Sequence, residues 1–270
     1  MPFSGANALI TGGSSGIGLA IAVELAGRGA HIHIAARRTS VLETACLEIG
    51  RAKQRPQQQV VAHACDVASP DDVARLFAQL HSAGADPSIV VNSAGMTLPG
   101  YFESVSVEEF ERVMQVNFMG TLHVLKHAVP LMMARGRGHI LNVGSVASLI
   151  GVFGMSPYCS SKFAVRGLTE SLRSELKPHN ISVSLLCPPD TDTPMLATDA
   201  LLMPRETKAL SKTAGVLSPQ VVARAAVLGL ARGQAVIVPG FDGRFTALAQ
   251  RLVPGLVERI SDRIIARAKR

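Results

Sequence analysis

Aromatic and charged side chains are scarce in this sequence of 270 residues. It contains no tryptophan, two tyrosines and nine phenylalanines, so we expect a hydrophobic core of aliphatic side chains. Hydrophobic residues make up 47% of the chain and charged residues 17%, a balance that excludes an intrinsically disordered protein. A large aliphatic core is typical of a parallel sheet that is buried on both faces.

Cysteine is also rare, and long apolar runs are missing. The cysteines are Cys46, Cys65, Cys159 and Cys187, and they form no CxxC pair, so we expect reduced thiols and a cytoplasmic protein. No apolar stretch reaches the roughly 18 residues of a spanning helix. The chain starts without a basic segment before its first apolar run, so we expect no ordinary signal peptide. The histidines show no ligand spacing, so we expect no metal site.

The basic excess is concentrated at one end of the chain. The net charge is +7, and residues 241–270 contain seven Lys or Arg and three Asp or Glu, which gives this segment +4. The other 240 residues carry a net charge of only +3. Nucleic-acid-binding domains combine a basic face with aromatic side chains on which bases stack. We therefore expect no nucleic-acid partner.

Short β-rich runs alternate with helical periods along most of the chain. The expected strands are Ala8–Thr11, His31–Ala36, Gln59–Cys65, Ile89–Asn92, His139–Gly144, Ile181–Cys187 and Ala235–Val238. The expected helices are Gly16–Arg28, Val41–Lys53, Asp71–His81, Glu108–Ala134, Pro157–Lys177 and Pro219–Arg232. The alternation predicts an α/β fold, a single doubly wound (Rossmann-type) parallel sheet with helices on both faces, over residues 1–240. We expect Pro130 to disturb its helix, and residues 188–216 show no clear period.

A loop of small residues follows the first expected strand. Residues 11–18 read TGGSSGIG and precede a helix, whose free N–H groups and positive dipole end can bind a pyrophosphate. The spacing is G-x-x-x-G-x-G rather than the more common G-x-G-x-x-G, and a glycine-rich turn without a ligand is the alternative interpretation. The position between strand and helix favours a dinucleotide, bound by Gly12, Ser14, Ser15, Gly16, Ile17 and Gly18.

The second expected strand ends without an acidic residue. An NAD site usually has Asp or Glu near this position to bind the ribose 2′-hydroxyl, whereas this sequence has Ala36 followed by Arg37 and Arg38. Arginine suits a 2′-phosphate because the guanidinium forms bidentate, charge-assisted hydrogen bonds. The pattern predicts NADP(H), with Arg37 as the stronger candidate. A solvated arginine pair is the alternative.

A candidate catalytic group surrounds the second tyrosine. Tyr158 and Lys162 are four residues apart in an expected helix, which places both on one face. Ser145 ends the preceding strand. Asn117 is a poor helix former within a helical pattern, a conflict that indicates a functional kink. Tyr101 has no lysine four residues on, so we interpret it as a loop or pocket-lining residue.

Together these motifs resemble the short-chain dehydrogenase/reductase family. The matching pieces, in family order and spacing, are TGGSSGIG at 11–18, Asp66-Val67, Asn92 to Gly95, Asn117, Ser145, Tyr158, Lys162 and Pro188. The resemblance covers about residues 5–240 and implies one doubly wound domain with a seven-stranded parallel sheet. It also implies a homo-oligomer, either a dimer or a tetramer.

The resemblance implies a role for each matched residue. Tyr158 would donate the proton in carbonyl reduction, and Lys162 would bind the nicotinamide ribose and lower the pKa of Tyr158. Ser145 would hold the substrate oxygen, and Asn117 would position a water in a proton relay. Further cofactor contacts are implied for Asp66, Val67, Asn92, Ala94, Gly95, Pro188 and Thr193. The usual Pro-Gly after the sixth strand is Pro188-Pro189 here. With all four catalytic positions intact, a non-catalytic NADP-binding regulator is disfavoured.

Shorter stretches resemble one subfamily, the 3-ketodihydrosphingosine reductases. They are Cys187–Pro194, Tyr158–Gly167, Glu175–Pro178 and Glu206–Lys208. This resemblance implies NADPH-dependent reduction of the 3-keto group of a lipid-like ketone, a long-chain 2-amino ketone. Residues Met195–Val216 would then cover the acyl chain, or form an ordinary surface lid. An NADP-dependent reductase of 3-oxoacyl, steroid or retinoid-type carbonyls would have the same catalytic residues.

Residues 241–270 form a basic amphipathic tail. Apolar residues recur at steps of three and four from Phe245 to Ile265, with arginines between them, and Pro254-Gly255 predicts a break. One interpretation is a helix that packs on the domain or on a subunit partner. The other is peripheral contact with the cytoplasmic membrane surface, which suits an enzyme with a water-insoluble substrate.

Overall fold

Seven parallel strands form one sheet in the computed structural model, which describes residues 3–212 and 215–269. They are β1 (Asn7–Thr11), β2 (His31–Ala36), β3 (Val60–Ala64), β4 (Ile89–Asn92), β5 (Gly138–Val143), β6 (Ile181–Leu186) and β7 (Val236–Ile237). Their order across the sheet is β3-β2-β1-β4-β5-β6-β7, and each neighbouring pair is parallel. The strand order reverses between β1 and β4, and open α/β sheets bind ligands in the crevice beyond the strand ends at such a switch point.

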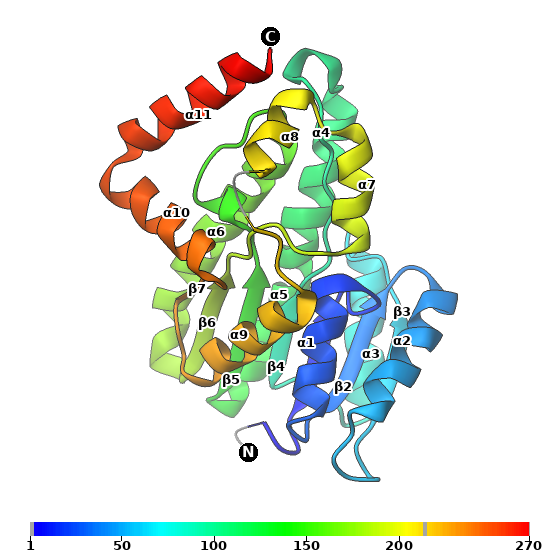
Figure 1. The fold of residues 1–270 in the computed structure, drawn as a ribbon. Coiled ribbons are helices and arrows are strands. Elements are labelled where there is room, and N and C mark those ends of the chain that lie inside the picture. Colours follow the sequence, from blue (N-terminus) through cyan, green and yellow to red (C-terminus); the bar gives the residue numbers. More distant parts are fainter. Residues whose placement is uncertain (1–2, 213–214, 270) are drawn as a thin grey trace.

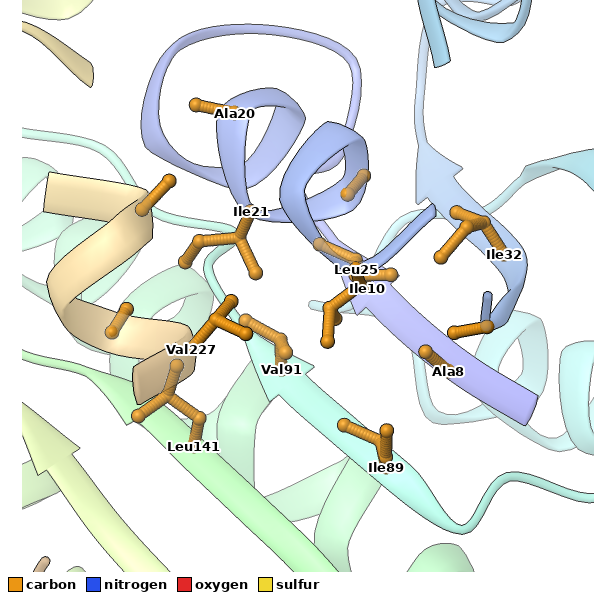
Figure 2. Close-up of a cluster of buried hydrophobic side chains, with 14 of the residues drawn as sticks. Ala8, Ile10, Ala20, Ile21, Leu25, Ile32, Ile89, Val91, Leu141 and Val227 are labelled. Carbon is orange, nitrogen blue, oxygen red and sulfur yellow. The ribbon is translucent and has the colours of Figure 1, made fainter. Parts of the chain in front are cut away.

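Helices cover both faces of this sheet (Figure 1). The α-helices of the described residues are α1 (Gly16–Ala26), α2 (Thr39–Arg51), α3 (Pro70–Ser82), α4 (Val107–Met114), α5 (Gly120–Arg135), α6 (Ser156–Leu176), α7 (Pro194–Leu202), α8 (Arg205–Ser211), α9 (Pro219–Ala231), α10 (Phe241–Leu252) and α11 (Pro254–Ala268). On one face, Ile21 and Leu25 of α1 and Val227 of α9 pack against Ile10 and Val91 of the central strands (Figure 2).

The opposite face carries α3, α5 and α6. Successive side chains of a strand point to opposite faces, so Leu9, beside Ile10, packs in a second core with Leu76 of α3 and Val124 of α5. Both cores consist mainly of aliphatic side chains. The predicted doubly wound α/β sheet is therefore confirmed.

The structure differs from the single helix predicted over residues 108–134. Pro130 lies inside α5, which continues to Arg135, so the proline does not end this helix. Proline removes the hydrogen bond to the carbonyl four residues earlier, and both Lys126 and Pro130 are exposed, so water can bind that carbonyl. The pattern is interrupted instead by a π-helical turn at Gln115–Met119, which contains Asn117.

The segment 188–216 contains two helices where we expected no period. Thr193 caps α7 by accepting a hydrogen bond from the backbone N–H of Leu196, and Pro194 occupies the first turn. The helices α7 and α8 are short, and Leu201 and Leu202 are exposed, so no apolar stripe marks a core-facing side. Residues 213 and 214 of this segment lie outside the described residues.

The C-terminal tail forms α10 and α11, which meet at Val253, beside the expected break. The second helix, α11, contacts α8 (Figure 1), and Arg205 of α8 donates a hydrogen bond to the carbonyl of Lys269 at 2.9 Å. Arg270 lies outside the described residues. Across residues 3–212 and 215–269, the helices all lack the length and hydropathy needed to cross a membrane.

Candidate active site

A cavity of about 330 Å³ lies at the switch point, and its walls come from the loops that follow β1 to β6. This volume falls within the range of roughly 300–1,000 Å³ that is typical of ligand pockets. Of the predicted site residues, those that line it are Gly12, Ser14, Ser15, Gly16, Ile17, Gly18, Arg37, Arg38, Asp66, Val67, Ala94, Gly95, Ser145, Tyr158, Lys162, Pro188 and Thr193. Asn92 and Asn117 are buried nearby without lining the cavity.

The glycine-rich loop presents an uncapped helix start to the cavity. The side chain of Ser15, the residue before α1, makes no capping hydrogen bond to the helix backbone, and the first turn of α1 contains no acidic residue. Gly12 has a φ of +66°, and a Cβ there would lie 2.7 Å from the backbone nitrogen of Ala94. A Cβ on Gly18 would lie 2.3 Å from the carbonyl oxygen of Gly12. The loop therefore requires glycine at both positions, and the free N–H groups fit a pyrophosphate.

Arg37 and Arg38 line the cavity at the end of β2. Both side chains are exposed, and neither forms an ion pair with a carboxylate in the described part of the chain. Asp66 lines the same cavity after β3, and its carboxylate accepts a hydrogen bond from the backbone N–H of Ala68 at 3.0 Å. Two guanidinium groups without a carboxylate partner at the cavity wall fit a phosphorylated ribose.

Asn92 supports the cavity from below. Its amide nitrogen donates to the Asn142 side chain at 2.8 Å, and this bond ties the ends of β4 and β5 together. The amide nitrogen of Asn142 in turn donates to the hydroxyl of Thr169 on α6 at 2.9 Å. Asn92 thus holds the sheet and α6 together beneath the site instead of forming its wall.

The side chain of Asn117 links the loop after β4 to α6. Its oxygen accepts from the backbone N–H of Met96 at 2.8 Å, and its nitrogen donates to the Met96 carbonyl at 2.9 Å and to the hydroxyl of Ser161 at 2.8 Å. The hydroxyl of Ser161 donates to the carbonyl of Tyr158 at 2.7 Å. The π-helical turn therefore brings Asn117 against the helix that carries Tyr158 and Lys162.

Lys162 is buried beneath Tyr158. Its ammonium nitrogen donates to the carbonyl of Val143, at the end of β5, at 2.8 Å and lies 5.5 Å from the centre of the Tyr158 ring. Burial lowers the pKa of Lys162 to about 8, so the side chain remains mostly cationic at pH 7. It supplies a fixed positive charge close to the tyrosine.

Tyr158 is partly buried on α6 and is hydrogen-bonded to the side chain of Ser145. Burial raises the pKa of Tyr158 far above its ordinary value of about 10, although the bond with Ser145 acts to lower it. The proposed effect of Lys162 on the pKa of Tyr158 stays a prediction: the ammonium lies close to the ring, and burial is the larger influence on this pKa in the structure. The hydroxyl is neutral at pH 7 and is poised as a proton donor.

Several residues at the site were not predicted from the sequence. Ser161 anchors Asn117, and its position between Tyr158 and Lys162 was the available signal. Asp190 and Asp199 both line the cavity, and Asp199 interrupts the apolar helix α7. Tyr101 does not line the cavity. Its hydroxyl donates a hydrogen bond to the carboxylate of Glu206 at 2.9 Å.

The fold, the glycine-rich loop and the Ser145–Tyr158–Lys162 group define a dinucleotide-binding reductase. The model of the short chain dehydrogenase family matches residues 6–201, and the chain belongs to this family. It is an oxidoreductase with a nicotinamide cofactor.

Known proteins that the chain resembles include two named reductases. It is 38% identical to a 3-dehydrosphinganine reductase of Danio rerio, over 90% of this chain and 74% of that protein. It is also 38% identical to a 3-ketodihydrosphingosine reductase of Bos taurus, over 88% and 72%. A solved short-chain dehydrogenase from Sphingobium yanoikuyae in complex with NADPH is 28% identical, with a TM-score of 0.76 over 93% of this chain and 94% of that one.

Proposed function

We propose that this chain is an NADPH-dependent reductase that converts 3-ketodihydrosphingosine to dihydrosphingosine in sphingolipid synthesis. The observation that carries the proposal is the 38% identity to reductases of that name over about nine-tenths of the chain. The cavity supports it, because a partly buried tyrosine that can protonate a ketone lies beside lining residues suited to a cofactor.

Ser145 and Tyr158 act on the ketone oxygen. Both hydroxyls lie at the cavity wall, where a carbonyl oxygen can accept a hydrogen bond from each of them. A bound nicotinamide supplies the hydride to the carbonyl carbon. Tyr158 donates the proton to the oxygen, which leaves an alcohol. The ammonium of Lys162 stabilises the resulting phenolate.

Lys162 and Asn117 keep this arrangement in place. Lys162 lines the cavity, and we propose that its cation binds the nicotinamide ribose there. Asn117 fixes the loop at Met96 against α6. We propose that it also positions a water for reprotonation of Tyr158.

Flexible apolar side chains form the substrate end of the cavity. Lining residues from α7 and its neighbours are Met96, Met155, Met195, Leu196 and Met203. Methionine is unbranched and adapts to irregular apolar surfaces. We propose that these residues receive the start of the aliphatic chain of the substrate.

A substrate panel tests the proposed function. Purified protein with NADPH is expected to reduce 3-ketodihydrosphingosine with a kcat/KM at least roughly tenfold above that for a 3-oxoacyl thioester, a steroid ketone or a retinoid aldehyde, because differential transition-state binding sets such ratios. NADPH oxidation and product formation are measured together. A higher kcat/KM for one of the other carbonyls would assign the chain to that substrate.

We further propose that residues 1–240 form the enzyme and that the tail contacts the cytoplasmic face of a membrane. The cavity-lining residues lie between positions 12 and 203. The exposed apolar residues of the tail are Phe241, Phe245, Leu248, Leu252, Val253, Leu256 and Ile260. They accompany a net charge of +4. At about 1 kcal/mol for each basic group, the charge supplies at most roughly 4 kcal/mol, so attachment is reversible.

Liposome co-sedimentation tests this contact. The full chain is expected to bind anionic vesicles at low salt and to be released at high salt, whereas a double variant with Phe245→Glu and Leu252→Glu stays in the supernatant. Leu47→Glu is the matched control, because Leu47 is also exposed but lies on α2. Equal binding by the double variant contradicts the proposal. If a chain ending at Asp242 instead changes from dimer or tetramer to monomer in light scattering, the tail is a subunit contact.

A further inference from the structure

A buried carboxylate without a cationic partner lines the substrate end of the cavity. Asp199 of α7 is 6% exposed and lines the cavity together with Tyr158. One of its oxygens accepts a hydrogen bond from the hydroxyl of Thr97, in the loop after β4. Within residues 3–212 and 215–269, the other oxygen has no hydrogen bond, and no Lys, Arg or His forms an ion pair with Asp199.

The negative charge of Asp199 acts on the catalytic tyrosine. Asp199 and Asp190 both contribute to the raised pKa of Tyr158, so the two carboxylates are close enough to disfavour a negative charge on that hydroxyl. Asp190 accepts a hydrogen bond from the hydroxyl of Ser211 at 2.6 Å. Burial and the repulsion from Asp190 also raise the pKa of Asp199 itself.

An uncompensated carboxylate at this place is costly. Burial of a charge is unfavourable unless the charge is paired and hydrogen-bonded. The basic groups that line the cavity are Arg37, Arg38 and Lys162, and none of them pairs with Asp199. Arg37 and Arg38 belong to the end of β2, and Lys162 is bonded to Val143. Among the described residues, no basic side chain pairs with Asp199, whereas a cationic ligand in the cavity could reach it.

We propose that Asp199 binds the ammonium group on the carbon next to the ketone of the substrate. The inference rests on the proposed function, since a 2-amino ketone carries this ammonium two bonds from the carbonyl carbon. When the ketone oxygen contacts Ser145 and Tyr158, the ammonium is held on the α7 side of the cavity. The ammonium is the counter-ion that the carboxylate of Asp199 lacks. It also weakens the repulsion between Asp199 and a negative charge on the Tyr158 hydroxyl.

Asp199 would also select against neutral lipid ketones. A ketone without the amino group leaves the buried carboxylate unpaired, and a site with an unpaired polar group rejects such analogues strongly. Removal of one partner of a buried charge pair costs roughly 30-fold or more in affinity. This recognition would distinguish an amino ketone from a 3-oxoacyl or steroid ketone.

The test compares two substrates in two variants. Asp199→Asn keeps the size of the side chain and its bond with Thr97. We expect a loss of roughly 30-fold or more in kcat/KM for 3-ketodihydrosphingosine, mainly through KM. The same variant should reduce the analogue without the amino group as well as the wild type does, or better. Asp192→Asn is the matched control, because Asp192 is exposed on the same segment and does not line the cavity.

Each outcome separates this inference from the proposed function. If the wild type reduces 3-ketodihydrosphingosine and Asp199→Asn reduces it equally well, Asp199 does not bind the ammonium and the proposed function stands. Equal losses on both substrates, together with a lower melting temperature, would show a structural role and overturn the inference in the same way. If the wild type reduces neither substrate, the proposed function fails and the inference fails with it.

Discussion

Replacement of Tyr158 by phenylalanine is expected to lower kcat for ketone reduction by roughly 10²–10⁴-fold, the usual contribution of a positioned general acid. The change removes the hydroxyl that is hydrogen-bonded to Ser145, which is the proton source at the cavity wall. The ring stays, and with it the packing over the ammonium of Lys162. We therefore expect NADPH to bind with nearly unchanged affinity, as measured by titration of cofactor fluorescence.

Tyr101→Phe is the matched control for this experiment. Tyr101 is the other tyrosine of the chain, and its hydroxyl bonds to Glu206 outside the cavity. This variant should keep the wild-type kcat within about threefold, a change of less than 1 kcal/mol in the barrier. If Tyr158→Phe also stays within that range, Tyr158 is not the acid.

The second large effect concerns cofactor choice. Arg37→Ala is expected to weaken NADPH binding by about 2 kcal/mol, or roughly 30-fold, which is the low end for a truncated charge pair because the side chain is exposed. NADH has no 2′-phosphate, so its affinity should change little. Both dissociation constants are measured by fluorescence titration at one ionic strength, since salt screens exposed charges.

Two further arginine variants serve as comparisons for Arg37→Ala. Arg38→Ala should have a smaller effect than Arg37→Ala, and Arg51→Ala should have none, because Arg51 ends α2 and does not line the cavity. Equal affinity of the wild type for NADPH and NADH would contradict the assignment of NADP(H).

The sheet and the cofactor loop could be predicted because periodicity and small residues reflect strong local constraints. The strands are rich in aliphatic residues, and each ends within about a residue of its expected boundary. The glycine-rich loop depends on close backbone contact, as the 2.3 Å distance from a Cβ on Gly18 to Gly12 demonstrates. Such constraints restrict the residue types that each position accepts, so they can be recognised from the sequence alone.

Other features depend on contacts between distant segments. Asn117 indicated a kink, but its bonds to Met96 and Ser161 require the loop after β4 and α6 to be placed. The helix α7 lacks an apolar stripe because one of its sides faces the cavity and not the core. The rise in the pKa of Tyr158 follows from burial, which residue spacing does not reveal.

Asp199 illustrates the same limit. From the sequence alone, the single aspartate within PMLATDALL is an ordinary helix residue. Its importance follows from its burial near Tyr158 and from the lack of a basic side chain that pairs with it among the described residues. The sequence signal was its position in an otherwise apolar stretch. Only the folded chain brings Thr97 to it from about one hundred residues earlier.

The central claim is that this chain transfers hydride from NADPH to the 3-keto carbon of 3-ketodihydrosphingosine. The most direct measurement incubates the purified protein with this ketone and NADPH that carries deuterium at both C4 positions, followed by mass spectrometry of the product. The account predicts dihydrosphingosine with one deuterium at C3, formed by the wild type and by Tyr101→Phe but nearly absent with Tyr158→Phe. Recovery of unreacted ketone from the wild type, while the same preparation reduces a carbonyl without the amino group, would contradict it.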